Sequence, residues 1–351
     1  MKNINLYMLR SSLTSLFTLF VLLTSCSSDD GGEAYTGAPI IESVMPSGYN
    51  EDGSLKPLEP VIKVDPNNYY VIHGKGFSSV QKIYFNDYDT YFRSTFVTDT
   101  DIIVMVDENT PYADTSNQLK IVTEKGTVVY DLIVAPPAPT INWFNSINAL
   151  AGEVVTVSGK YFLDPIVKVG TTDAVVISST LTEIKFTMPT NSTNKLISVT
   201  NITGTATSKM AVGSALYDDI IQGDAGHWTW DGSAFTTDFT EDKAQGNLSI
   251  KLVFPGWGGA DMKFNAKDVS MYKSFTVKVK SVSENPDAKL TFVFGGWAYQ
   301  IQKAITSQWT VIEIPFSTIG NPTSFDQLTF QESGNFGGNT ILLDEMGFVL
   351  K

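Results

Sequence analysis

The chain of 351 residues has one cysteine, Cys26, and two histidines, His73 and His227. A lone cysteine cannot form an intramolecular disulfide, so an exported chain of this sequence must be stabilised by the burial of apolar side chains. So few cysteines and histidines also argue against a serine or cysteine nucleophile with a histidine base. The sequence has no phosphate-binding loop, dinucleotide fingerprint or metal-ligand spacing. These absences predict a protein that is not an enzyme and needs no cofactor.

Basic side chains are fewer than acidic ones, with 24 Lys and Arg against 37 Asp and Glu and a formal net charge of -13. Nucleic acids are bound by clustered lysine and arginine, so this balance argues against a nucleic-acid partner. An acidic surface suits a soluble protein whose ligands are neutral.

The N-terminus lacks a hydrophobic run long enough for a transmembrane helix. The apolar segment 13–23 follows the basic residues Lys2 and Arg10 and is too short to span a bilayer. It ends in the letters LTSC, which resemble the lipobox of bacterial lipoproteins. That resemblance implies a signal peptide at 1–25 and lipidation of Cys26.

Residues 26–37 form an acidic tether, in which the letters SSDDGGE follow the cysteine. This run resembles the export signal that sends lipoproteins of Bacteroidota to the outer face of the outer membrane. The resemblance implies a lipid-anchored protein at the cell surface. The alternative is a tether that only keeps the chain solvated.

No segment after the N-terminus has a sustained helical period, whereas β-branched and aromatic residues are plentiful and alternate with polar ones. Strands are therefore expected throughout. The letters VIHGKGF at 71–77 and VTVSGKYF at 155–162 are variants of one pattern, each preceded by a proline-led strand and followed by an alternating strand. This repetition indicates a tandem duplication.

The repeated pattern resembles the IPT/TIG family of immunoglobulin-like sandwiches, whose Gly-Lys-Gly-Phe motif is matched best at 74–77. In the second copy Tyr161 stands where the first has Gly76, so a different turn is an alternative there. The resemblance implies two immunoglobulin-like domains, at 38–135 and 136–213, that act as spacers joined by the stiff linker APPAP. Neither copy gathers titratable groups or exposed aromatic residues, so no site is expected in them.

The segment 214–351 differs in composition from the two repeats before it and contains five of the six tryptophans. Its apolar residues still alternate, for example at 248–254, 275–279 and 290–294. This pattern predicts one larger antiparallel sandwich or jelly roll. The expected fold class is therefore all-β, with two immunoglobulin-like sandwiches followed by a larger β-sandwich.

Three stretches of this segment resemble the sequences of carbohydrate-binding modules of the jelly-roll type. They are DVSMYKSFTVKVKS at 268–281, WTVIEIPFSTI at 309–319 and ILLDEMGFV at 341–349. Sugar binding needs an aromatic side chain that stacks on the apolar face of a ring and polar groups that bond its hydroxyls. The letters FPGWGGA and FGGWAYQ place Trp257 and Trp297 beside glycines that clear space for a ligand. These two tryptophans are the predicted sugar platforms.

Further candidates accompany the two platforms. Trp228 and Trp230 lie two residues apart and share a face if extended, either as a third platform or as a cover for one end of the sandwich. Trp297 faces outward if its strand keeps alternating, whereas a bulge at Gly295-Gly296 would return it to the core. The remaining candidates supply a ring or polar groups, and they are Tyr299, Gln300, Gln302, Asp261 and Lys263.

Acidic residues leave two alternatives open. A calcium site joining the first and last strands is the alternative to no metal, with the ligands Asp218, Asp219 and Asp344. A glycosidase or lyase needs two facing carboxylates, and no local motif selects such a pair. The available pairs are Glu313 with Glu332 and Asp261 with Glu345.

The whole arrangement resembles the surface glycan-binding lipoproteins encoded beside starch-utilisation-like transport systems. That resemblance implies a non-catalytic monomer that captures a polysaccharide for hydrolases, a neighbouring glycan-binding partner and a TonB-dependent transporter. Flat tryptophan platforms favour an equatorially linked chain, best a β-glucan such as mixed-linkage glucan or xyloglucan. The alternative is an adhesin or scaffold that binds a protein through the same aromatic patch.

Overall fold

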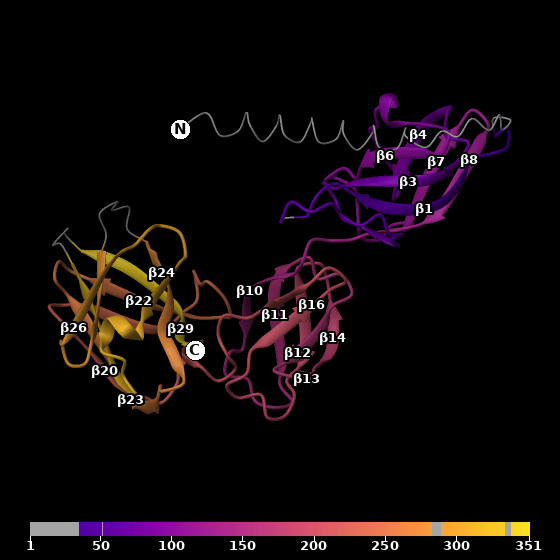
Figure 1. Ribbon diagram of the computed structural model, residues 1–351. Helices are drawn as coiled ribbons and strands as arrows, with labels where there is room; N and C mark the ends of the chain where they lie inside the picture. The colour runs from indigo at the N-terminus through magenta and orange to yellow at the C-terminus, as the bar shows by residue number, and fades with distance from the viewer. Residues whose placement is uncertain (1–34, 51, 283–288, 334–337) are drawn as a thin grey trace. The chain divides into compact units, whose positions relative to one another are not determined.

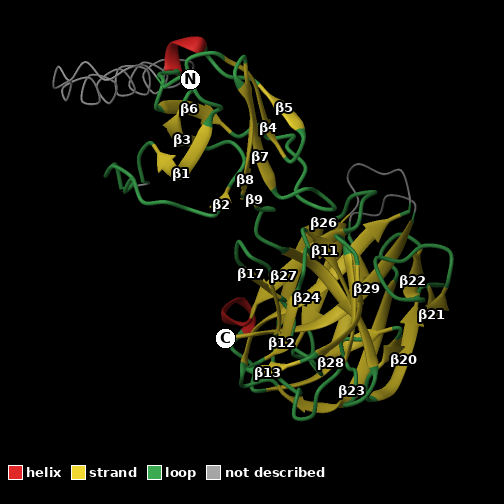
Figure 2. Cartoon of the chain, turned by 90° about the vertical axis from the view of Figure 1, so that its right-hand side faces the viewer, coloured by secondary structure: helices red, strands yellow, loops and turns green. Residues whose placement is uncertain are grey.

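The computed structural model describes residues 35–50, 52–282, 289–333 and 338–351 (Figure 1). These residues form strands and loops with two short 3-10 helices, η2 (Ser94–Phe96) and η3 (Phe316–Ile319) (Figure 2). No helix among them is long and apolar enough to cross a membrane. The predicted all-β fold class is confirmed, whereas the signal peptide and Cys26 lie outside the described residues.

The chain divides into two compact units, residues 1–137 and 138–351. In the first unit two sheets enclose an apolar core, in which Ile72, Phe77 and Phe85 are fully buried. One sheet has the order β1-β3-β6 and the other β5-β4-β7-β8, and β2 pairs with β9. The strands are β1 (Ile40–Ser47), β2 (Lys63–Val64), β3 (Tyr69–Lys75), β4 (Val80–Phe85), β5 (Tyr88–Thr90), β6 (Asp101–Met105), β7 (Gln118–Thr123), β8 (Gly126–Asp131) and β9 (Ile133–Val134).

The second unit begins with another small sandwich, whose core includes Val157, Phe162 and Phe186. Its two sheets have the orders β10-β11-β15-β14 and β13-β12-β16-β17. The strands are β10 (Thr140–Asn145), β11 (Val154–Lys160), β12 (Ile166–Val169), β13 (Thr172–Asp173), β14 (Val175–Ser179), β15 (Glu183–Thr187), β16 (Ile197–Thr200) and β17 (Thr205–Thr207).

The first glycine of the repeated motif permits a close approach between strands in both small sandwiches. A Cβ on Gly74 would lie 1.9 Å from the carbonyl oxygen of Ile40, and one on Gly159 would lie 1.9 Å from that of Thr140. Any larger side chain would push the neighbouring strand away. The repeated glycine is therefore explained by packing within each sandwich.

The turn after this glycine is the same in both copies. Gly76 has a φ of 80° and Tyr161 a φ of 62°, so both lie in the left-handed region. Phe77 and Phe162 follow them and are buried in their respective cores. The tyrosine of the second copy therefore adopts the conformation that glycine favours, without changing the backbone of the turn.

The C-terminal sandwich is built from a seven-stranded and a five-stranded sheet. The first contains the path β19-β18-β29-β22-β21, with β24 between β29 and β27, and the second has the order β20-β23-β28-β25-β26. The strands of the first are β18 (Ala215–Asp218), β19 (Ile220–Ile221), β21 (Ala234–Phe239), β22 (Ser249–Phe254), β24 (Tyr272–Ser281), β27 (Thr310–Pro315) and β29 (Asn339–Leu350). Those of the second are β20 (Asp224–Trp230), β23 (Gly259–Asp268), β25 (Lys289–Phe294), β26 (Tyr299–Ala304) and β28 (Ser324–Glu332).

Aromatic rings fill the space between these two sheets. Phe275 of the seven-stranded sheet stacks on Phe325 of the five-stranded sheet, with ring centroids 6.1 Å apart. Phe294 and Phe348 meet Phe275 edge-on at 5.8 and 6.3 Å. This core occupies the inner face of the five-stranded sheet, so the alternate side chains of its strands point outward.

Asp218, at the end of β18, connects the small sandwich of the second unit to the C-terminal sandwich. Its Oδ2 accepts hydrogen bonds from Ser146 Oγ (2.9 Å) and from the N–H of Ile147. The hydroxyl of Tyr272 also donates to Asn194 Oδ1 (2.9 Å). The two sandwiches of this unit are therefore joined by hydrogen bonds as well as by the chain.

Buried carboxyl groups near this junction make stability depend on pH. Burial raises the pKa of Asp344 to about 7 and also raises the pKa values of Asp218 and Glu345. The folded chain therefore holds these protons to higher pH than the unfolded chain, so the free energy of unfolding falls as pH rises through the raised pKa values. We expect the unfolding midpoint of the second unit to be lower at pH 8 than at pH 5, by on the order of 5 °C.

Tryptophan fluorescence during heating measures this unit selectively, because all six tryptophans follow residue 138. Asp344→Asn should flatten the dependence, because it removes a carboxyl that titrates in the range while keeping an oxygen for the N–H groups of Ala244 and Gln245. A midpoint that rises between pH 5 and pH 8 would contradict the expected sign.

Candidate functional site

The outer face of the five-stranded sheet carries most of the predicted site residues. Residues paired across neighbouring strands point to the same face, so the register defines two rows of side chains from β20 to β26. The first row is Trp228, Asp261, Thr329, Val293 and Gln300. The second row is Trp230, Gly259, Gln331, Thr291 and Gln302.

Trp230 lies across the neighbouring strand because that strand has a glycine at the paired position. A Cβ on Gly259 would lie 1.9 Å from the Trp230 indole, so only glycine leaves room for the ring there. Trp297 reaches the same region from the hairpin between β25 and β26. The centroids of the two indoles are 6.3 Å apart, so a ring from β20 and a ring from this hairpin lie close together.

The centre of this face is polar but nearly inaccessible. Asp261 is 2% exposed and Thr329 is 4% exposed, although both belong to the outer row. Gln327 Nε2 donates to both carboxylate oxygens of Asp261 (3.0 and 2.9 Å), and the Thr329 hydroxyl donates to one of them. Asp261 is therefore engaged within the sheet, where it orients the amide of Gln327.

Trp257 stands in the turn between β22 and β23 and is 51% exposed. Its backbone is left-handed, with a φ of 65°. Its N–H donates to Glu332 Oε2 (2.9 Å), and its carbonyl accepts a hydrogen bond from Gln331 Nε2 (3.3 Å). Because Glu332 is fully buried, the turn is held from inside while the indole stays at the surface.

Gly295-Gly296 forms the start of a hairpin turn and not a bulge. Phe294 pairs with Tyr299 across the turn, and the two glycines and Trp297 all have positive φ, at 59°, 59° and 76°. Trp297 is 45% exposed, so the alternative that places it in the core is wrong. The glycines supply the left-handed backbone that a four-residue turn requires here.

Trp228 lies on the edge strand β20 and is 45% exposed. The Lys263 ammonium lies 5.2 Å from the centroid of its ring, which is a cation–π contact. Lys263 pairs with Gln327, so both polar heads lie on the outer face next to the tryptophan. This edge of the face therefore combines an indole with hydrogen-bond donors.

Tyr299 and His227 lie on the inner side of their strands. A Cβ on Gly320, which follows η3, would lie 2.3 Å from the Tyr299 hydroxyl. His227 pairs with Met262, a core residue, and its ring stacks on Phe235 with centroids 4.6 Å apart. Neither residue shares the face of the tryptophans.

The carboxylates considered for catalysis have structural partners. Glu313 pairs with Lys209 (2.7 Å) and accepts a hydrogen bond from Ser274 Oγ (2.6 Å), and Glu345 pairs with Lys278. Glu332 and Asp261 hold the turn and the sheet described above. The structure does not bring either proposed pair together across an open cleft of the tryptophan face.

The carboxylates considered for calcium accept hydrogen bonds from backbone N–H groups. Asp344 Oδ2 accepts from Ala244 and Gln245 at 2.8 and 3.0 Å, and Asp219 Oδ1 accepts from Asn247 and Leu248 at 2.9 Å each. Within the part of the chain that the structure describes, no group of three His, Cys, Asp or Glu side chains could hold a metal ion.

Three polar residues of β28 belong to the site but escape prediction from the sequence. Gln327, Thr329 and Gln331 alternate with the core residues Leu328 and Phe330. The apolar residues of this alternating strand predict the core, and the polar residues between them then point to the outer face. The three polar residues could therefore have been found from the same alternation.

These features define a β-sandwich with an aromatic outer face that follows two immunoglobulin-like sandwiches. Residues 216–351 match the family model described as the Expansin-like protein C-terminal domain. A curated relative, an IPT/TIG domain-containing protein from Bacteroides ovatus, is 29% identical over 171 residues, which are 47% of this chain and 33% of the relative. The chain thus spans about a third of the length of that relative.

A solved structure of a surface glycan-binding protein has a similar fold. PbSGBP-B from Prevotella bryantii aligns over 91% of this chain and 100% of its own, with a TM-score of 0.52 and 17% identity. SGBP-B from a complex xyloglucan utilization locus in Bacteroides uniformis aligns over 90% and 100%, with a TM-score of 0.40 and 15% identity. The likeness to PbSGBP-B shows that the chain resembles a surface glycan-binding protein in fold, as the sequence predicts.

Proposed function

We propose that this protein is a non-catalytic lipoprotein of the cell surface that binds a polysaccharide on the outer face of the five-stranded sheet. The observation that carries the proposal is the exposure of indole rings at this face, where Trp228, Trp257 and Trp297 are 45, 51 and 45% exposed. Exposed aromatic clusters mark binding sites, and the apolar face of a sugar ring covers an indole well. The amides of the two outer rows provide donors and acceptors for ring hydroxyls.

The placement of the tryptophans favours a chain over a single sugar. The exposed indoles come from three separate elements of this sandwich. Trp228 lies on β20, Trp257 in the turn between β22 and β23, and Trp297 in the hairpin between β25 and β26. A ligand that contacts all three rings is therefore an oligosaccharide.

The ligand we propose is a β-glucan, either mixed-linkage glucan or xyloglucan. Equatorially linked chains are ribbon-like and turn the apolar faces of successive rings toward flat platforms, which suits indoles spaced along one sheet. The proposal is supported by the common fold with a protein described as a surface glycan-binding protein. Delivery of the glycan to hydrolases and to a TonB-dependent transporter is part of the same proposal.

The anchor in this proposal is lipidated Cys26, with the immunoglobulin-like sandwiches as spacers.

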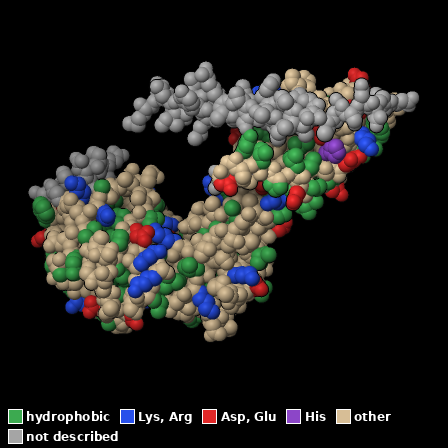
Figure 3. Space-filling view, viewed as in Figure 1, with side chains coloured by type: hydrophobic (Ala, Val, Ile, Leu, Met, Phe, Trp, Pro, Cys, Tyr) green, Lys and Arg blue, Asp and Glu red, His purple; other side chains and the backbone are tan. Residues whose placement is uncertain are grey.

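Figure 3 shows charged side chains of both signs interspersed with uncharged surface on the face in view, and the net charge is -13. Such a surface suits a neutral glycan better than a nucleic acid.

Native affinity gels test the proposal directly. The lipid-free chain should be retarded by mixed-linkage glucan or xyloglucan, with a dissociation constant on the order of micromolar to sub-millimolar, or about 5 to 8 kcal/mol. Mannan, xylan and starch serve as the comparison panel. An absence of retardation by every polysaccharide would refute glycan binding and favour a protein ligand, whereas release of reducing ends would refute the non-catalytic assignment.

A further inference from the structure

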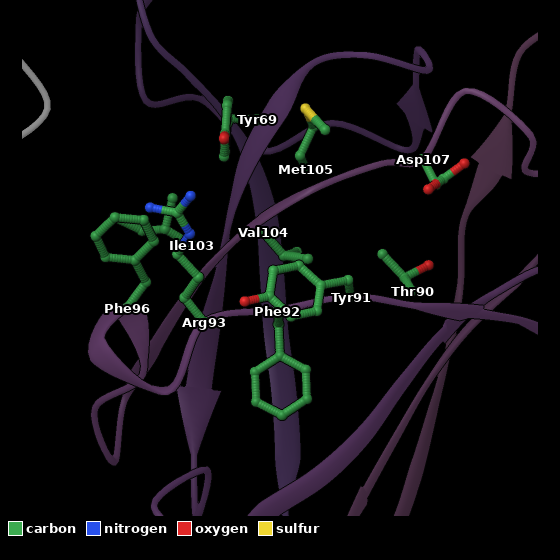
Figure 4. A pocket seen from close by; sticks show the side chains of 10 residues that line it. All are labelled: Tyr69, Thr90, Tyr91, Phe92, Arg93, Phe96, Ile103, Val104, Met105 and Asp107. Carbon is green, nitrogen blue, oxygen red and sulfur yellow. The ribbon is translucent and has the colours of Figure 1, made fainter. Parts of the chain in front are cut away.

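The first unit has a pocket of about 190 Å³ on the outer side of the sheet β1-β3-β6 (Figure 4). Tyr69 and Met105 are paired on this side, as are Val71 and Ile103. Val71 and Ile103 are each 5% exposed although they point away from the core. Ile103 lines the pocket together with the exposed rings of Tyr69 and Tyr91. The expectation that neither repeat gathers exposed aromatic residues is therefore wrong for the first repeat.

The aromatic residues of this pocket are unusually accessible. Tyr91 is 78% exposed, the highest value among the large apolar side chains that the structure describes. Tyr69 is 38% exposed and Met105 is 37% exposed. In Figure 4 the Tyr91 ring lies in the middle of the pocket, with Tyr69 and Met105 above it. The pocket thus presents an open ring face next to an apolar wall.

Arg93 adds a positive charge to the pocket. It is the only arginine after Arg10, in a chain with 37 acidic residues. Its guanidinium lies 5.9 Å from the centroid of the Phe96 ring, and within the described residues it forms no salt bridge or side-chain hydrogen bond. A guanidinium presents a planar fork of donors that matches a carboxylate in a bidentate manner. This arginine is free to do so.

Polar groups at the other side of the pocket are already partly engaged. Asp107 lies away from Arg93 in Figure 4, and its Oδ1 accepts hydrogen bonds from the N–H and the amide of Asn109 (2.8 and 3.0 Å). The Thr90 hydroxyl donates to the carbonyl of Tyr88 (3.2 Å). Both residues retain acceptor capacity for a ligand hydroxyl. The charge of Arg93 is therefore not cancelled by Asp107.

We propose that this pocket binds a single pyranose ring that carries a carboxylate, such as a uronic acid. The ring stacks on Tyr91, the carboxylate pairs with Arg93, and hydroxyls reach Asp107 and Thr90. The volume suits one ring and not a chain. An anion is otherwise disfavoured by the net charge of -13, so a local unpaired cation is what allows this ligand. The site shares no residue with the tryptophan face and extends recognition to acidic sugars.

The test is a titration of residues 27–351, the chain without the expected signal peptide and lipidated cysteine, with D-glucuronate, observed by NMR at the arginine Nε–Hε signal. Arg93 is the only arginine in these residues, so a single signal reports on the pocket. We expect the signal to shift with glucuronate, and neutral glucose to bind at least about ten-fold more weakly. Tyr91→Ala should weaken glucuronate binding about ten-fold. No shift at tens of millimolar glucuronate, or equal binding of glucose, would overturn the proposal.

Two control variants separate this site from the proposed function. Lys75→Gln removes the same charge elsewhere in the first unit and should leave glucuronate binding unchanged, whereas Arg93→Gln, followed by backbone amide signals, should weaken it about ten-fold. Combined Trp257→Ala and Trp297→Ala should also leave it unchanged. Loss of glucuronate binding in that tryptophan variant would place the ligand on the C-terminal face and refute the pocket.

Discussion

Alanine at both Trp257 and Trp297 is expected to abolish retardation of the protein by its polysaccharide in an affinity gel. A stacked indole contributes about 1 to 2 kcal/mol, so each single substitution should weaken binding about ten-fold. The two rings are held by different turns, one between β22 and β23 and the other between β25 and β26, so their losses should add to roughly a hundred-fold in the double variant. An interaction of modest affinity does not remain measurable after such a loss.

The matched control is Trp143→Ala, which removes an indole from β10, outside the C-terminal sandwich. It should be retarded like the unmodified chain, and all variants should keep the same unfolding midpoint within a few degrees. Unchanged retardation of the double variant would show that the tryptophan face is not the binding site. Equal losses in the control and in the double variant would point to a general effect on folding.

Much of the fold can be predicted from patterns among residues that lie close together in the sequence. The alternation of Leu290, Phe292 and Phe294 predicts a strand with one buried face, and the structure places all three in the core. The Gly-Lys-Gly-Phe motif predicts a glycine turn and a buried ring, and Gly76 and Phe77 provide them. These predictions succeed because each depends on residues that are neighbours along the chain.

The site is predicted less completely because its geometry depends on which strands pair. The outward direction of Gln300 and Gln302 follows once the hairpin at Gly295-Gly296 is known, but two adjacent glycines fit a bulge as well as a turn. The burial of Asp261 depends on Gln327 and Thr329, which are 66 and 68 residues away along the chain. Only the register of β23 with β28 brings these residues together.

The inner position of Tyr299 has a similar cause. The residue follows the letters FGGWA and looks like part of the same aromatic group in the sequence. Its strand pairs so that Gln300 faces outward, and Tyr299 must then face the other way. A change of one residue in the register would reverse these two directions, and the local sequence does not encode the choice.

Alanine at Gly259 should displace the Trp230 indole and thereby weaken polysaccharide binding. The added methyl group would lie 1.9 Å from the ring, whereas the backbone of Gly259 is not in the left-handed region and accepts alanine. The cost therefore comes from the clash, which we expect to lower the free energy of unfolding by about 1 to 3 kcal/mol. Because Trp297 lies 6.3 Å from Trp230, a displaced Trp230 also disturbs the exposed platform, and binding should weaken about ten-fold.

A double-mutant cycle with Trp230→Ala isolates the clash. On that background the methyl group of Gly259→Ala meets no indole, so its effect on the free energy of unfolding, measured by circular dichroism in denaturant, should fall to near zero. An undiminished cost would mean that the methyl group clashes elsewhere. If Gly259→Ala and Trp230→Ala weaken binding equally, and the double variant weakens it no further, the glycine acts by letting the indole lie over the sheet.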